Sequence, residues 1–215
     1  SAFNYYLKHK NVTFKNVFNG FRLFEDDYIP KFLNATECQK LLFAAKRYNN
    51  YLLHDFILLA LNTGCRASEL TTLTWDNVSI NDRFLIIRNS LSKNKKTVYK
   101  PINDTSFDAL IRLKTHRKYV FYNPKTNSHI KSFRRGFQCA AQRADLGHLR
   151  IHDLRHSFAS FLINNGRSLY EVQKLLGHTQ IITTQRYAHL TQDTLLEAAN
   201  TATQALKGLV ECEFL

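Results

Sequence analysis

The chain has 215 residues, 44% of them hydrophobic, which is enough to bury an ordinary globular core and excludes a disordered tail. Its 30 lysines and arginines face only 17 aspartates and glutamates, and the formal charge of +13 exceeds what solubility requires. Nucleic acid fits this charge better than an anionic membrane surface, because no long basic amphipathic helix is evident. Charge alone leaves a merely basic surface open.

Cysteine placement and hydropathy narrow the class further. The four cysteines lie far apart and form no CxxC pair, which argues against a disulfide framework or a cysteine zinc site. No run approaches the roughly 18 apolar residues of a membrane span, and the start SAFNYYLKHK lacks the apolar stretch of a signal peptide. We therefore expect a soluble cytoplasmic protein, and the absence of methionine indicates a piece of a longer chain.

The first part of the chain predicts a linker followed by three helices. Residues 1–30 are aromatic and basic without a regular period, and we interpret them as a linker. Asn34 followed by Glu37 is typical of an N-cap with its capping-box partner, and a second helix is expected near 51–62, ending at Gly64. A third helix should follow directly, because apolar residues recur at helical spacing at Ala67, Leu70 and Leu73.

Between Val78 and Pro101 the pattern changes from helical to β-rich. Two apolar stretches, at 84–87 and 97–99, are separated by residues with turn chemistry at 92–94. This pattern predicts a small antiparallel sheet. The elements expected after it are a helix over 104–113 capped by Asp104, a short strand at 120–122, a basic helix over 131–144, a helix over 154–164, a helix opened by a capping box at Ser168 and Glu171, and a last helix over 193–206.

The first of three chemically suggestive motifs is TGCRASEL at 63–70. Its glycine break places Arg66 at a helix start, with Glu69 three residues later on the same face and able to hold the arginine. A guanidinium in this position can bind two phosphate oxygens and stabilise charge that develops in a transition state. For this motif alone, a local ion pair that merely stabilises the helix is the better interpretation.

The second motif is HDLRH at 152–156. His152 and Arg155 lie three apart and share a face if a helix begins here, which pairs a proton carrier with a phosphate-binding group. His152 and His156 also have the spacing of zinc hydrolases with HExxH. Asp153 in place of the glutamate of that motif, and the lack of an evident third ligand, argue against zinc.

The third motif combines LGH at 176–178 with RYAHL at 186–190, so that Tyr187 follows His178 by nine residues. A tyrosine after a basic residue is unremarkable on its own, since most of the ten tyrosines are expected to pack with their hydroxyl groups at a surface.

Taken in order, these motifs resemble the tyrosine recombinase family, to which phage integrases belong. The resemblance covers roughly residues 32–192 and includes, besides the three motifs, the hairpin SKNKKTVYKPIND. It implies a mostly α-helical α+β catalytic-domain fold with a small antiparallel sheet, over residues 31–207. It also implies that residues 1–30 are a linker or the remnant of a preceding core-binding domain, and that the apolar tail 208–215 docks on its own domain or on a neighbour.

The resemblance assigns roles to individual residues. Tyr187 would attack the scissile phosphate, and its phenol, with a free pKa near 10, needs nearby cations and a proton acceptor. Arg66 and Arg155 would clamp the nonbridging oxygens, which suits a planar, always-charged guanidinium. Glu69 would support Arg66. No metal, nucleotide or other cofactor is implied.

Three further roles concern protons and hydrogen bonds. Lys93 would protonate the departing 5′ oxygen, His152 would help accept the tyrosine proton, and His178 would donate a hydrogen bond to the phosphate. Which hairpin lysine reaches the site depends on register, which sequence specifies poorly. Other cations are assigned to contacts with the DNA backbone: Lys95, Lys96, Lys131, Arg134 and Arg135.

The family resemblance implies double-stranded DNA as partner, four copies on two DNA sites, and accessory DNA-bending proteins. Two other functions share parts of this pattern. A type IB topoisomerase uses the same tyrosine chemistry, but HDLRH and the compact length favour recombination. A noncatalytic DNA-binding module would need the arginines and have no use for Tyr187.

Overall fold

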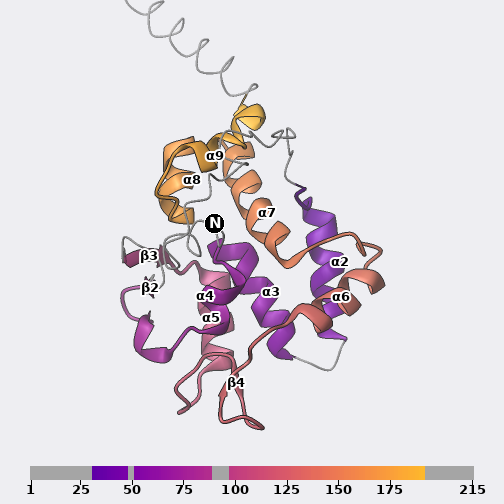
Figure 1. The fold of residues 1–215 in the computed structure, drawn as a ribbon, viewed down its shortest axis with the longest axis vertical. Coiled ribbons are helices and arrows are strands. Elements are labelled where there is room, and N and C mark those ends of the chain that lie inside the picture. The colour runs from indigo at the N-terminus through magenta and orange to yellow at the C-terminus, as the bar shows by residue number, and fades with distance from the viewer. Residues whose placement is uncertain (1–30, 48–50, 89–96, 192–215) are drawn as a thin grey trace, which may run out of the picture.

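Helix α3 (Tyr51–Thr63) runs through the centre of the computed structural model, which describes residues 31–47, 51–88 and 97–191 (Figure 1). Its sequence, YLLHDFILLALNT, is apolar on nearly every side, as expected for a helix with several neighbours. It packs against α2 (Ala35–Lys46), α5 (Asp104–Leu113) and α7 (Ile151–Asn164). The predicted second helix is thereby confirmed, and Gly64 follows its last residue.

Helix α2 begins with the predicted capping box. Asn34 Oδ1 accepts a hydrogen bond from the backbone N of Glu37 at 2.9 Å, and the Asn34 backbone N donates to the Glu37 carboxylate at 2.8 Å. These contacts satisfy two backbone donors that the first helical turn leaves without partners. The same reciprocal cap opens α8 (Leu169–Leu176), at Ser168 and Glu171.

The predicted antiparallel sheet is also present. Strands β1 (Val78–Ser79), β2 (Phe84–Arg88) and β3 (Thr97–Pro101) pair in the order β1-β2-β3, after the short 3-10 helix η1 (Trp75–Asn77). The β2–β3 register places Leu85 opposite Lys100. The turn predicted at 92–94 lies outside the described residues. A second, two-stranded sheet joins β4 (Tyr122–Asn123) to β5 (Ser128–His129).

Several predicted boundaries were wrong by a few residues. Asn103, and not Asp104, is the N-cap of α5, because its side chain accepts from the backbone N of Ser106 at 2.9 Å. The short strand begins at Tyr122, since Val120 and Phe121 form a turn ahead of it. The other differences concern helices: α4 is only Ala67–Thr71, α6 is Arg134–Arg143 with Lys131 ahead of it, and α7 begins at Ile151, not Leu154.

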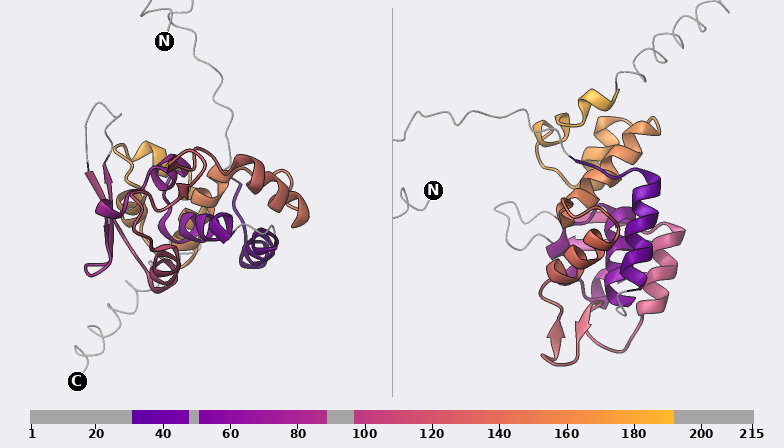
Figure 2. Two further views of the ribbon diagram at one scale, coloured as in Figure 1. Left: turned by 90° about the horizontal axis from the view of Figure 1, so that it is seen from below. Right: turned by 90° about the vertical axis from the view of Figure 1, so that its right-hand side faces the viewer.

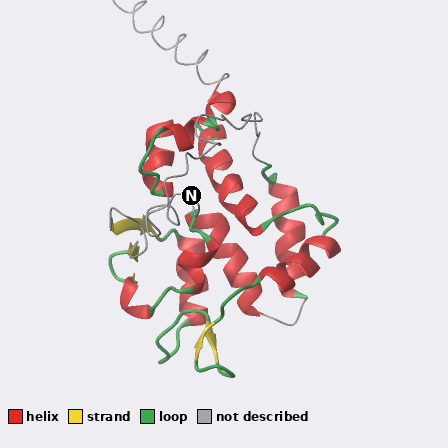
Figure 3. Cartoon of the chain, in the orientation of Figure 1, coloured by secondary structure: helices red, strands yellow, loops and turns green. Residues whose placement is uncertain are grey.

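The chain past α8 continues through α9 (Ile182–Gln185) and the 3-10 helix η2 (Ala188–Thr191). Figure 1 and the right-hand view of Figure 2 place α8 and α9 at one end of the molecule and the β4–β5 hairpin at the other. Figure 3 shows that helix dominates the described chain, which confirms the mostly helical α+β class. Among the described residues, none of the helices combines the length and apolarity needed to cross a membrane.

Buried side chains form two clusters. The main core surrounds α3 and includes Leu53, Phe56 and Leu154. A smaller cluster joins α7 to α8 and takes in the ring of Tyr187. Its buried members are Ala159, Ile163, Val172, Leu176 and Tyr187. Helix α7 contributes to both clusters, so the motif at its start lies where the two meet.

Candidate active site

The loop between α3 and α4 positions Arg66. Gly64 adopts a left-handed backbone conformation, with φ +58°, and an added Cβ would lie 2.4 Å from Cδ1 of Phe158. Two residues on, Arg66 is the N-cap of α4, and its Nη1 lies 2.7 Å from Oε1 of Glu69. The other carboxylate oxygen of Glu69 accepts from the Arg66 backbone N at 2.8 Å. Glu69 therefore fixes both the backbone and the side chain of Arg66.

Arg155 lies on α7 with only 3% of its surface exposed. Its Nη1 donates to the carbonyl oxygen of Gly64 at 2.7 Å, and its Nη2 donates to that of Leu176 at 2.8 Å. The guanidinium thus joins the C-terminal ends of α3 and α8, where unpaired carbonyls carry partial negative charge. Burial, and then the neighbouring Arg66, lower the pKa of Arg155 to about 10, so the group remains a cation at neutral pH. Within the described part of the chain, these two bonds use two of its five N–H donors.

Lys100 connects β3 to the same two helix ends, those of α3 and α8, and the sequence did not suggest this role. Its side chain is 1% exposed, and Nζ donates to the carbonyl oxygens of Leu175 at 2.8 Å, Thr63 at 3.2 Å and Gly64 at 3.4 Å. Burial lowers its pKa. Strand alternation is the signal that points to it, because Lys100 shares the inward face of β3 with Val98.

His178 follows the left-handed cap of α8. Gly177 has φ +71°, and a Cβ there would lie 3.0 Å from Val98 Cγ2. The next residue, His178, is half-buried, with Nδ1 2.9 Å from Oγ1 of Thr184. Burial, followed by Arg155 and Arg66, lowers the pKa of His178 to about 3. The imidazole is therefore neutral at pH 7 and lies within the field of both arginines.

Tyr187 is buried, with 2% exposure, and its hydroxyl lies 2.5 Å from Nδ1 of His156. His156 is itself only 3% exposed. The sequence motif had suggested His152 as the acceptor of the tyrosine proton. His152 is exposed, and its ring packs nearly perpendicular to that of His156, with centroids 4.8 Å apart. In the sequence, His156 is notable only as the second histidine of the zinc-like spacing, and its position directly after Arg155 is the signal that could have identified it.

Both α7 imidazoles are neutral at pH 7. Burial lowers the pKa of His156 to about 4, with His152 as the next cause. Protein atoms that shield part of the ring, together with Arg155, lower the pKa of His152, and Asp153 opposes them. A neutral imidazole keeps one ring nitrogen able to accept a proton, as an acceptor of the tyrosine proton must.

The other lysines and arginines predicted for catalysis or DNA binding either lie outside the described residues or lie on another part of the surface. Lys93, Lys95 and Lys96 lie outside the described residues. Arg134 and Arg135 open α6, Lys131 precedes it, and all three side chains are exposed. Across the described ranges, no three His, Cys, Asp or Glu side chains come close enough together to hold a metal ion.

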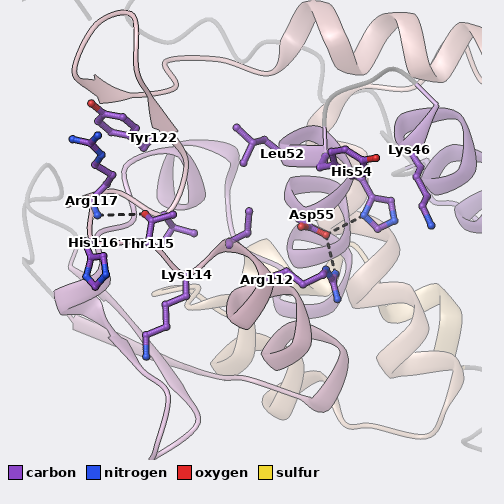
Figure 4. Close-up of a pocket in the computed structure, with 13 residues that line it drawn as sticks. Lys46, Leu52, His54, Asp55, Arg112, Lys114, Thr115, His116, Arg117 and Tyr122 are labelled. Atoms are coloured by element: carbon purple, nitrogen blue, oxygen red, sulfur yellow. Dashed lines mark hydrogen bonds and ion pairs between the residues drawn. The ribbon is translucent and has the colours of Figure 1, made fainter.

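A large pocket of about 1280 Å³ lies at the N-terminal end of α3, whereas Arg66 follows the C-terminal end. Figure 4 shows the residues that line this pocket. In it Asp55 binds both His54, at 3.0 Å, and Arg112, at 2.9 Å. Thirteen residues of α3 separate this end from the Gly64 loop, which corresponds to about 18 Å along the helix axis. The pocket is therefore separate from the cluster of arginines, histidines and Tyr187.

Known proteins match both the sequence and the fold. The model of the phage integrase family matches residues 31–194. A tyrosine recombinase of Thermosipho africanus is 32% identical over 174 residues, which cover 79% of this chain and 61% of that protein. The solved catalytic domain of bacteriophage HP1 integrase has 31% identity and a TM-score of 0.64, covering 79% of this chain and 93% of that one.

One structure solved with DNA has the same fold. The Tn1549 transposon integrase in complex with transposon right end DNA aligns with a TM-score of 0.71 at 20% identity, over 94% of this chain and 76% of that one. The chain spans less than two thirds of the length of relatives such as the Thermosipho protein, at 61%, and the XerD recombinase of Rhizobium meliloti, at 49%.

Proposed function

The chain belongs to the phage integrase family, and from this premise we propose that it is the catalytic part of a site-specific DNA recombinase. The observation that carries the proposal is the meeting of four distant segments. Arg155 binds the loop that precedes Arg66 and the helix end that precedes His178. The hydroxyl of Tyr187 contacts His156, the neighbour of Arg155. These contacts support the proposal, because a guanidinium suited to binding phosphate and a candidate nucleophile come from neighbouring segments.

In the proposed reaction, the Tyr187 hydroxyl attacks a backbone phosphorus and releases a 5′ hydroxyl. The product is a 3′-phosphotyrosine, and a 5′ hydroxyl from a second duplex later displaces the tyrosine to join new strands. Because the phosphodiester energy is kept in the covalent link, the cycle needs no nucleotide hydrolysis. Arg66 and Arg155 supply fixed positive charge for the negative charge that grows on the nonbridging oxygens.

The proposed proton transfers involve separate groups. Lys93 donates to the leaving 5′ oxygen, and the histidine pair of α7 receives the phenolic proton. His178 donates a hydrogen bond to the phosphate. The contact with Thr184 supports this role, because an Nδ1 that accepts from the threonine hydroxyl leaves its proton on Nε2. Double-stranded DNA, four copies on two sites and accessory DNA-bending proteins complete the proposal.

Covalent capture on DNA tests the proposal. Duplexes with a nick beside a randomised recognition sequence allow selection of DNA that becomes covalently attached, because the nicked fragment diffuses away and prevents religation. The chain and its full-length parent should both give a denaturation-resistant adduct, and Tyr187→Phe should abolish it while keeping DNA affinity. DNA binding without an adduct in either protein would assign the chain to noncatalytic DNA binding. Site-independent relaxation of supercoiled plasmid would favour a type IB topoisomerase.

A further inference from the structure

We propose that Nδ1 of His156 is the atom that takes the phenolic proton when Tyr187 attacks DNA. The inference rests on the proposed recombinase function and revises the sequence-based role of His152. His156 then contacts a reacting atom and is a catalytic residue, additional to the arginines, His178 and the hairpin lysine.

The contact geometry supports this role. The hydroxyl oxygen of Tyr187 and Nδ1 of His156 are 2.5 Å apart, a short separation for a hydrogen bond. The tyrosine ring is held by the apolar cluster of α7 and α8, in which Val172 and Leu176 are buried. Packing thus fixes the ring while His156 fixes the hydroxyl. A general base must lie within such hydrogen-bond reach of the proton that it removes.

The surrounding charges favour proton transfer when DNA is bound. The titratable groups that face His156 are His152, Asp153 and Arg150 at the start of α7, and Arg186 and Tyr187 near α9. Without DNA, burial, then His152 and then the two arginines lower the pKa of His156 and keep the imidazole neutral, so its lone pair is available to the phenol. A bound phosphate offsets the positive charges and makes the imidazole more basic. Asp153, fully buried and 3.0 Å from Arg150, stabilises the imidazolium that forms.

The step balances in atoms and charge. The bond from Tyr187 Oη to phosphorus forms as the bond from phosphorus to the 5′ oxygen breaks. The phenolic proton moves to Nδ1 of His156, and the 5′ oxygen takes its proton from a different donor, the proposed Lys93. In strand joining the proton returns from His156 to the tyrosine. His152 is exposed, and its ring contacts the buried imidazole of His156.

His156→Asn tests the role, because an amide retains a hydrogen-bonding atom near the position of Nδ1 and cannot act as a base. Single-turnover cleavage of the selected nicked duplex should slow about 100-fold. The deficit should shrink as pH rises, and also when Tyr187 is replaced by the more acidic fluorotyrosine. Thermal unfolding and affinity for intact duplex verify folding, with His156→Gln as a second variant if asparagine destabilises the domain.

Changing the leaving group distinguishes a residue that accepts the tyrosine proton, such as His156, from a residue that protonates the departing 5′ oxygen. A substrate with sulfur in place of the bridging 5′ oxygen expels a thiolate, which needs no proton donor. The His156→Asn deficit should persist with this substrate, whereas the deficit of Lys93→Ala should disappear. The proposal is overturned if the sulfur substrate restores the cleavage rate of His156→Asn, or if that variant cleaves the ordinary substrate at the native rate. Faster cleavage by His156→Asn would also overturn it, since His156 would then restrain the tyrosine. Failure of the recombinase function itself is distinct, because the native chain would then form no adduct.

Discussion

Gly64 shows how strongly one backbone position controls the site, since its carbonyl binds both Arg155 and Lys100. In Gly64→Ala the left-handed backbone and the clash with Phe158, 2.4 Å from the added Cβ, act together. We expect a loss of about 2 kcal/mol or more in the free energy of unfolding, measured by urea denaturation. The cleavage rate per folded molecule should also fall, because the Gly64 carbonyl positions Arg155 and Lys100.

Two other glycines separate the causes of that loss. Gly166 also has a positive φ, +76°, but an added Cβ there has nothing within 4 Å. Gly166→Ala should therefore report the backbone strain alone, about 1 kcal/mol. Gly147→Ala, with Gln142 Cγ at an ordinary 3.6 Å, should change stability little. Equal losses in all three variants would contradict a steric role for Phe158.

Arg155→Lys should not be a conservative change. The arginine reaches the carbonyls of Gly64 and Leu176 and still has donors for a phosphate, whereas an ammonium is a single point with three donors. We expect a cleavage rate about 100-fold lower, measured by covalent adduct formation. Arg167→Lys, which changes an exposed arginine next to Glu171, is the matched control and should cleave at the native rate. A native rate in Arg155→Lys would remove this residue from the site.

The sequence identified the charged residues of the candidate site better than it identified their partners. Arg66, Arg155 and Tyr187 were singled out by motif, and the structure brings their segments together. Lys100 and His156 were missed because their importance lies in burial and in contacts with distant carbonyls or hydroxyls. Such contacts are set by tertiary packing, which motif spacing does not encode.

At the scale of elements, local interactions were the most predictable. The capping boxes of α2 and α8 were correctly predicted because every atom involved lies within four residues. The start of α5 was wrong by one residue, since Asn103 and Asp104 are both good N-caps and only the backbone geometry decides between them. Strand β4 was misplaced because its pairing with β5 depends on the turn between them.

Lys100 connects three elements, and Lys100→Met tests whether that connection serves stability or the site. Methionine fills a similar volume, and removing a buried ammonium relieves a desolvation cost that offsets part of the lost hydrogen bonding. We expect the free energy of unfolding to change by only about 1 kcal/mol. Cleavage should fall about 10- to 100-fold, because the loops before Arg66 and His178 lose their common donor.

The exposed Lys114→Met is the matched control for the lysine substitution and should leave both quantities unchanged. A large loss of stability with full cleavage activity per folded molecule would show that Lys100 serves the fold alone.

Considered as a whole, the molecule has a main core around α3 and a smaller cluster that holds Tyr187. The mostly helical α+β class followed from the change between helical and strand periodicity along the chain. The position of the second cluster could not be predicted from periodicity, because contacts such as that of Arg155 with Leu176 join segments 21 residues apart or more. The candidate site lies at the junction, so His156 is buried and His178 is half-buried.

That burial predicts how the stability of the whole domain depends on pH. The folded-state pKa values of His156 and His178 are about 4 and about 3, below the ordinary value of 6.5. The folded state therefore binds fewer protons than the unfolded state between these values. The stabilising contribution is complete above pH 6.5 and is lost as pH falls toward 4 and then 3. Each histidine should add a slope of at most about 1.4 kcal/mol per pH unit.

Urea denaturation of the DNA-free chain from pH 7.5 to 4.5 measures this slope, and His178→Asn should remove the part due to that imidazole. His148→Asn, at an exposed position between α6 and α7, is the control and should keep the native slope. Bound DNA should flatten the curve, because phosphates beside Arg66 and Arg155 offset the positive charge that helps to lower the pKa of His178. A slope that His178→Asn leaves unchanged would mean that this imidazole is hydrated in the folded domain, and that the arginines do not act on it as their positions imply.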